Sequence, residues 1–149
     1  MTEVEAAERA RVVAIALEWD GTPYRPDVRI KNVAGDCTFV AKVYEEAGVI
    51  APVHIPPYSP SSHLNRASQL YLTKVMEQPR VREIDEVALL PGDLVLYHFG
   101  LAFSHAGIVL PPGWPEIIHG DLNAKHIIRA QGNQGNLAAA KAMRFFTLW

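Results

Sequence analysis

Residues 104–119 read SHAGIVLPPGWPEIIH: two short apolar runs, each bounded by a histidine, with a turn rich in proline and glycine between them. Such runs predict β-strands, and a short turn between two strands predicts an antiparallel hairpin. With Pro111 to Gly113 as the loop, and Gly113 in the left-handed conformation that three-residue hairpins require, His105 lies directly across from His119. Directly opposed side chains share a face, with Cβ atoms about 4.5–5.5 Å apart. The stretch therefore predicts that one imidazole orients the other through a hydrogen bond.

Further strands are predicted on both sides of this hairpin. Apolar or β-branched runs occupy Asp93 to Tyr97 before it and His126 to Arg129 after it. Lys141 to Trp149 ends the sequence as a closing strand, with a short apolar helix as the alternative. Gly, Pro, Asn and Asp separate these runs, as expected for strands that follow one another through turns. We therefore expect an antiparallel sheet of about five strands.

The first half of the chain has helical periodicity instead. Apolar residues from Glu3 to Trp19 leave one polar face. A second helix is predicted to begin at Cys37, with Asp36 or Gly35 as its N-cap. Repeated prolines between Ala51 and Pro60 exclude regular structure, and Ser62 to Glu77 can form a third helix. Helices in one half and an antiparallel sheet in the other predict an α+β fold, with the N-terminal helices packed on the sheet.

The composition is that of one globular domain spanning residues 1–149. The chain has 149 residues, 49% hydrophobic and 20% charged, which excludes a disordered, collagenous or fibrous protein. A net charge of -2 offers no general attraction to nucleic acid or to an anionic membrane, so neither is expected as a partner. The first residues are acidic and lack the cationic and apolar segments of a secretory signal. We therefore expect cytoplasmic synthesis without a signal peptide.

Cys37 is the candidate nucleophile. A cysteine in the first turn of a helix meets unpaired backbone N–H groups and the positive end of the helix dipole, which favour the thiolate. A lone cysteine is more often a small buried hydrophobe, but His105 and His119 supply the base and the group that orients it. The Cys37 backbone N–H is one candidate donor to an oxyanion. These residues predict acyl transfer, and the alternative is that the histidines only fill strand edges.

No metal or other cofactor is expected. The remaining histidines are scattered along the sequence without the spacing of metal ligands, so zinc is a weak competitor to the cysteine nucleophile.

Four sequence blocks resemble one family. They are WDGTPYR at residues 19–25, GDCT at 35–38, LPGDLV at 90–95, and SHAGI at 104–108 followed by IIH at 117–119. Together they resemble the NlpC-type cell-wall peptidases, papain-like cysteine hydrolases of bacteria and phages. The resemblance implies a papain-like fold in which Cys37 is the nucleophile, His105 the general base and later acid, and His119 the residue that orients His105. The implied substrate is a peptidoglycan stem peptide, cut between the γ-carboxyl of D-glutamate and the diamino acid.

The same resemblance implies three substrate-binding residues. Asp36 matches an aspartate that binds the free amine of the leading L-alanine, and helix N-capping is a compatible alternative. Tyr24 matches a tyrosine whose hydroxyl lines the site, with packing against the turn at Gly21 as the alternative. Ser104, next to the base, is counted with them. Asp93 also recurs in the family, but a role at a turn and strand start explains it.

The loop between Tyr24 and Cys37 is most similar to that of compact family members found with phage tails and gene-transfer particles. This implies association with tail proteins. The chain departs from the family at Thr38-Phe39, where a small Ser-Gly pair is usual, and at Arg25-Pro26, where glycines often follow the tyrosine. The substrate is therefore less firmly implied than the three catalytic residues.

Two alternatives to the peptidase stay open. One is a catalytically silent tail, assembly or cell-wall-binding component of the same fold. The other is an acyltransferase that uses the same Cys-His pair. An acyltransferase would need a lipid-facing apolar surface, of which the mixed charge of the predicted helices gives no sign.

Overall fold

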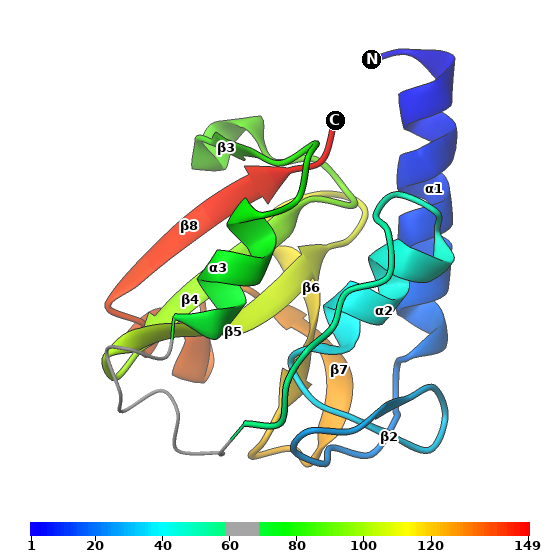
Figure 1. Cartoon of the computed structure of the whole chain (residues 1–149). Coiled ribbons are helices and arrows are strands. Elements are labelled where there is room, and N and C mark those ends of the chain that lie inside the picture. Colours follow the sequence, from blue (N-terminus) through cyan, green and yellow to red (C-terminus); the bar gives the residue numbers. More distant parts are fainter. Residues whose placement is uncertain (59–68) are drawn as a thin grey trace.

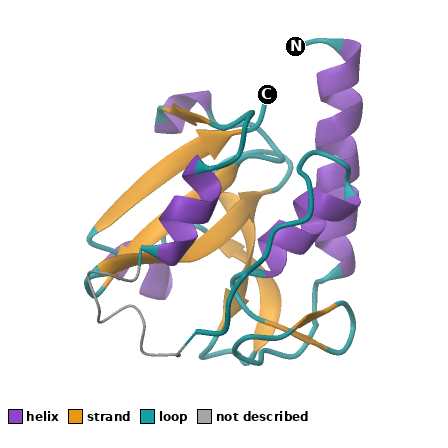
Figure 2. Ribbon diagram, viewed as in Figure 1, coloured by secondary structure: helices purple, strands orange, loops and turns teal. Residues whose placement is uncertain are grey.

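The computed structural model of the chain describes residues 1–58 and 69–149. In this part of the chain three α-helices lie beside a six-stranded antiparallel sheet with the strand order β3-β8-β4-β5-β6-β7 (Figures 1 and 2). The helices are α1 (Glu3–Glu18), α2 (Phe39–Glu46) and α3 (Leu70–Met76). The strands of this sheet are β3 (Arg82–Ile84), β4 (Leu94–Phe99), β5 (Ala102–Val109), β6 (Glu116–Asp121), β7 (His126–Gln131) and β8 (Ala142–Thr147). The predicted α+β fold is confirmed, with β3 as a strand beyond the expected five.

Shorter elements complete the description. Strands β1 (Arg29–Ile30) and β2 (Ala34–Gly35) pair with each other in the loop that precedes Cys37. Two short 3-10 helices, η2 (Glu86–Ala88) and η3 (Gly135–Ala139), flank the sheet strands.

The central strands are buried on both faces. Leu96 and Ile108 belong to the main core, which also contains buried residues of α1 and α2. Val95, Val109 and Ile117 belong to a second core, which includes Leu137 of η3. A strand covered on both faces needs apolar residues at successive positions, which explains why these segments read as continuous apolar runs and not as alternating ones.

The β5-β6 hairpin forms as predicted, but its register differs by two residues. Gly107, not His105, lies directly opposite His119. The loop is longer than Pro111 to Gly113, because Trp114 and Pro115 also belong to it and the Leu110 N–H donates to the Glu116 carbonyl. Pro115 has no N–H to donate to the strand ladder, so pairing starts only after it. A shift of two residues keeps both histidines on one face, since side chains alternate along a strand.

The helices also depart from expectation at their ends. Helix α1 begins as predicted, with the Thr2 hydroxyl accepting the Glu5 N–H at 3.1 Å. Helix α2 begins at Phe39, so the prediction that Cys37 lies in its first turn was wrong. Cys37 and Thr38 instead form a turn before the helix.

The segment between α2 and α3 fits the predictions only in part. Residues 51–58 have no regular structure, as the prolines predict. Of the helix predicted over Ser62 to Glu77, α3 forms the last part, and residues 59–68 lie outside the described residues.

A buried ion pair connects α1 to the sheet. The Arg9 guanidinium donates to Asp93 Oδ1 at 2.9 Å, to the Pro91 carbonyl at 3.1 Å and to the Thr147 hydroxyl at 3.1 Å. The second carboxylate oxygen of Asp93 accepts the Leu90 N–H at 2.8 Å. Asp93 therefore holds the turn before β4 and neutralises Arg9, in agreement with the structural role expected from the sequence.

We expect Asp93→Ala to lower the free energy of unfolding by about 3 kcal/mol, because it removes the buried carboxylate that faces Arg9 and, among the described residues, leaves only Glu5, at 2.9 Å, as an ionic partner. Urea denaturation followed by circular dichroism measures this change. Glu83→Ala is the matched control, because the Glu83–Arg144 pair is largely exposed and should cost about 1 kcal/mol or less. Equal losses in the two variants would contradict the role given to Asp93.

Candidate active site

The turn that carries Cys37 packs directly against the end of β6. A methyl group at Gly120 would lie 3.1 Å from the Cys37 nitrogen and 3.2 Å from the Tyr24 ring, closer than side chains normally approach. Glycine allows this contact without a shift of either backbone. Because Gly120 follows His119 in the strand, the contact places the nucleophile turn beside the strand that carries His119.

The Cys37 thiol lies against the neighbouring strand β5. Its Sγ donates to the Ser104 carbonyl at 3.4 Å, and Ser104 directly precedes His105. In the described part of the chain the thiol has no hydrogen bond to either histidine. Cys37 therefore contacts the chain neighbours of both predicted catalytic histidines.

The two histidine rings are hydrogen-bonded to each other. His105 Nε2 lies 2.8 Å from His119 Nδ1, and the ring planes are perpendicular. Tyr97 and Phe99 flank the His105 ring, with ring centroids 5.7 and 6.2 Å away. Within the described residues, His105 Nδ1 has no hydrogen-bond partner. In the tautomer that carries the proton on Nε2, His105 donates to His119 Nδ1 and its own Nδ1 is left to accept a proton.

Burial favours the neutral form of both the thiol and the imidazole. Burial and the Asp36 charge raise the pKa of the Cys37 thiol, which corrects the expectation of a thiolate at a helix start. Burial and the neighbouring His119 lower the pKa of His105 to about 3, and burial lowers the pKa of His119. If substrate binding brings the two groups together, a neutral thiol and a neutral imidazole suit general base catalysis, in which the proton moves as the sulfur attacks.

Asp36 is fully buried and its carboxylate is bound by the protein itself. Oδ1 accepts the backbone N–H of Thr38 at 2.8 Å and the Thr38 hydroxyl, as a helix-capping aspartate would. Oδ2 accepts the Asp27 N–H and the Tyr58 hydroxyl. The oxygens that an incoming substrate amine would need are thus already in use.

Tyr58 and Tyr71 are contacts that the sequence analysis did not single out. Tyr58 lies in the proline-rich segment and reaches Asp36, and the Tyr71 hydroxyl of α3 donates to the Cys37 carbonyl. Neither residue belongs to a motif near Cys37 in the sequence. Gly120 could have been found, because a glycine inside a strand pattern indicates close approach of another backbone.

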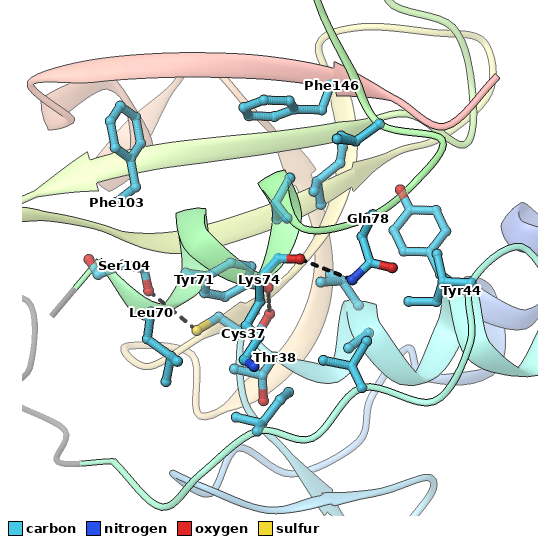
Figure 3. A pocket seen from close by; sticks show the side chains of 18 of the residues that line it. Cys37, Thr38, Tyr44, Leu70, Tyr71, Lys74, Gln78, Phe103, Ser104 and Phe146 are labelled. Carbon is cyan, nitrogen blue, oxygen red and sulfur yellow. Dashed lines mark hydrogen bonds between the residues drawn. The ribbon is translucent and has the colours of Figure 1, made fainter.

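Tyr24 and Ser104 lie where the resemblance puts them. Tyr24 packs on Gly120 beside Cys37, and burial raises the pKa of its hydroxyl, to which the negative charge of Asp36 also contributes. Ser104 lines a cavity of about 500 Å³ together with Cys37 (Figure 3). All six residues selected from the sequence therefore lie in one region of the fold, around the Cys37 turn and the His105–His119 pair.

The described residues contain no group of three or more His, Cys, Asp or Glu side chains that could hold a metal ion. In residues 1–58 and 69–149, no helix combines the length and the apolar composition needed to cross a bilayer.

Two solved structures from Trichomonas vaginalis resemble this fold. NlpC1 matches with a TM-score of 0.61 and 13% identity over 95% of this chain and 45% of that chain. NlpC2 matches with a TM-score of 0.61 and 14% identity over 93% of this chain and 45% of that chain. The chain thus spans less than half the length of either protein. No family model and no curated protein matches the sequence. At this identity the likeness establishes the papain-like fold.

We expect His105 to contribute to the decrease in the free energy of unfolding as the pH falls below 7. An unfolded histidine has a pKa of about 6.5, whereas that of His105 is about 3 in the fold. Between these values the unfolded chain binds a proton that folded His105 does not, so the free energy of unfolding decreases as the pH falls. His105→Gln should therefore lose less stability than the wild type between pH 7 and pH 5, as measured by urea denaturation.

The exposed His126 supplies the control for this measurement. His126→Gln should lose as much stability between the two pH values as the wild type. If His105→Gln does the same, His105 is not held neutral by the fold.

Proposed function

We propose that the chain is a cysteine peptidase that hydrolyses peptidoglycan stem peptides, at the bond between the γ-carboxyl of D-glutamate and the diamino acid. The observation that carries the proposal is the placement of the Cys37 turn against Gly120 and Ser104, the neighbours of the hydrogen-bonded His119 and His105. The papain-like fold and the resemblance of the motif blocks to NlpC-type peptidases support the reaction class and the substrate.

The reaction begins when Cys37 Sγ attacks the scissile carbonyl. His105 Nδ1 takes the thiol proton as the bond forms, and Nε2–H keeps its hydrogen bond to His119. The Cys37 backbone N–H, which interacts with its own thiol, is the candidate donor to the oxyanion. Collapse of the intermediate breaks the C–N bond, and His105 returns its proton to the leaving amine.

Water then completes the cycle. His105 removes a proton from a water molecule, which attacks the thioester on Cys37, and the C–S bond breaks. The peptide leaves as a carboxylate and the proton returns to the sulfur. No cofactor takes part in these steps.

The substrate amine and Tyr58 compete for the same carboxylate in this proposal. An L-alanine amine that binds Asp36 must displace the Tyr58 hydroxyl from Oδ2. A substrate whose amine binds elsewhere avoids this competition. The proline-rich segment around Tyr58 therefore bears directly on which stem peptides are accepted.

We further propose that the protein acts with phage-type tail proteins. The support is the resemblance of the loop between Tyr24 and Cys37 to that of tail-associated family members. Peptidoglycan would then be the wall that a tail encounters, and the tail proteins the partners that carry the enzyme to it.

Incubation with purified muropeptides, with products identified by mass spectrometry, tests the catalytic roles. Cys37→Ala should abolish cleavage, because the nucleophile is gone. His105→Ala should lower the rate by about 10²–10⁴-fold through loss of the base, and His119→Ala should lower it less. His126→Ala removes an exposed side chain outside the four motif blocks, so it is the control and should retain activity. Intact muropeptides with the wild type, or cleavage by Cys37→Ala, would contradict the proposal.

Gly120→Ala tests the contact that positions the nucleophile. The added methyl group must shift the Cys37 turn relative to β6 by a few tenths of an ångström. Because a displacement near 1 Å can cost about 10²-fold in rate, we expect a loss of about tenfold in kcat on muropeptides with a retained circular dichroism spectrum. Ala124→Ser, in the turn after β6, should leave the rate unchanged. Full activity of Gly120→Ala would mean that this contact does not position Cys37.

A further inference from the structure

The cavity beside Cys37 has a largely apolar wall. It lies between α2, α3 and the sheet face formed by β4, β5 and β8 (Figure 3). Its volume of about 500 Å³ falls within the range of small-molecule sites. The apolar side chains come from every side of it, including Val40, Ile55, Val75, Leu94 and Phe146.

Most polar groups of this wall are already bound within the protein. The Tyr71 hydroxyl donates to the Cys37 carbonyl, and the Tyr44 hydroxyl donates to the Gly92 carbonyl at 2.7 Å. The Gln78 amide donates to the Lys74 carbonyl at 3.0 Å. Each of these bonds uses a donor of the wall, so a polar ligand finds few free donors here and would bind weakly without them.

The charged and hydroxyl groups near the ends of the cavity also form ion pairs or hydrogen bonds within the protein. Lys74 pairs with Glu77, and Thr38 and Tyr58 both donate to the Asp36 carboxylate. This leaves the thiol of Cys37 and the side chain of Ser104 as the reactive, polar end of an otherwise apolar space. The chemistry of the wall therefore matches a molecule with one reactive carbonyl and a long aliphatic chain.

We infer that the cavity binds the aliphatic chain of a fatty acyl ester, with the ester carbonyl at Cys37, so that the enzyme also accepts acyl groups of medium or long chain. This activity goes beyond peptide cleavage and rests on the nucleophile of the proposed function. The thiol adds to the ester carbonyl, the C–O bond breaks, and the alcohol leaves with the proton that His105 took from sulfur. Water then cleaves the thioester to a fatty acid and the free thiol.

A series of p-nitrophenyl esters tests the inference. Acetate, butyrate, octanoate and laurate esters differ only in chain length, and each releases p-nitrophenolate when it acylates the enzyme. With the rate of Cys37→Ala subtracted, kcat/KM should rise about tenfold or more from acetate to octanoate, because each added methylene is buried. Intact mass spectrometry should detect the acyl group, and peptide mapping should locate it on Cys37.

Two substitutions on one helix test the role of the cavity independently of the rest of the site. Val75→Trp places a large ring in the cavity and should remove the preference for octanoate while acetate turnover is retained. Met76→Trp is the matched control, because Met76 is the next residue of α3, is exposed and does not line the cavity. It should keep the wild-type chain-length preference. If Val75→Trp does not fold, Ile55→Trp fills the cavity from the opposite segment.

The outcomes distinguish this inference from the proposed function. Equal rates on acetate and octanoate, or equal effects of Val75→Trp and Met76→Trp, would overturn the acyl-chain site. Muropeptide cleavage without a chain-length preference overturns the inference and leaves the peptidase. A chain-length preference that depends on Cys37, without muropeptide cleavage, supports the inference and overturns the peptidase.

Discussion

The close packing of the Cys37 turn on Gly120 is the constraint on which the rest of the site depends. With no side chain at Gly120, the backbone of Asp36 and Cys37 can lie against β6. The sheet register then fixes what surrounds the thiol: His119 adjoins Gly120 in β6, and Ser104 and His105 lie on β5 beside it. The buried pair of Arg9 and Asp93 holds α1 to the other end of this framework. The nucleophile is therefore positioned by backbone contact and not by its own helix.

Burial determines the electrostatics of the site. A charged thiolate and imidazolium would both lose their hydration here, so the fold favours the neutral thiol and the neutral ring. In the proposed reaction, proton transfer depends on the orientation of the His105 ring, which the hydrogen bond to His119 restrains, and not on a thiolate formed in advance. The same apolar surroundings extend past the thiol into the cavity under α3, which is the cavity that we propose for the aliphatic chain of an acyl ester.

The sequence predicted the elements better than their ends and contacts. The histidine pair was predicted although the hairpin register was wrong by two residues, because a shift of two keeps both rings on one face. The predicted start of α2 at Cys37 was wrong because Asp36 caps a turn that precedes the helix. The contacts of Tyr58 and Tyr71 could not be predicted, since a proline-rich segment has no periodicity to orient its side chains and long-range packing places α3. The cavity depends on that same packing and carries no sequence signal.

The central claim is that His105 acts directly on a neutral Cys37 thiol. The rate at which iodoacetamide alkylates Cys37, measured from about pH 5 to pH 8 in the wild type and in His105→Ala, tests it without any assumption about the substrate. The account predicts a nearly constant rate in the wild type, because the neutral ring accepts the thiol proton throughout this range. In His105→Ala the rate should rise about tenfold for each pH unit, because only free thiolate reacts. The same steep rise in both proteins would contradict the account, since His105 would then have no part in activating Cys37.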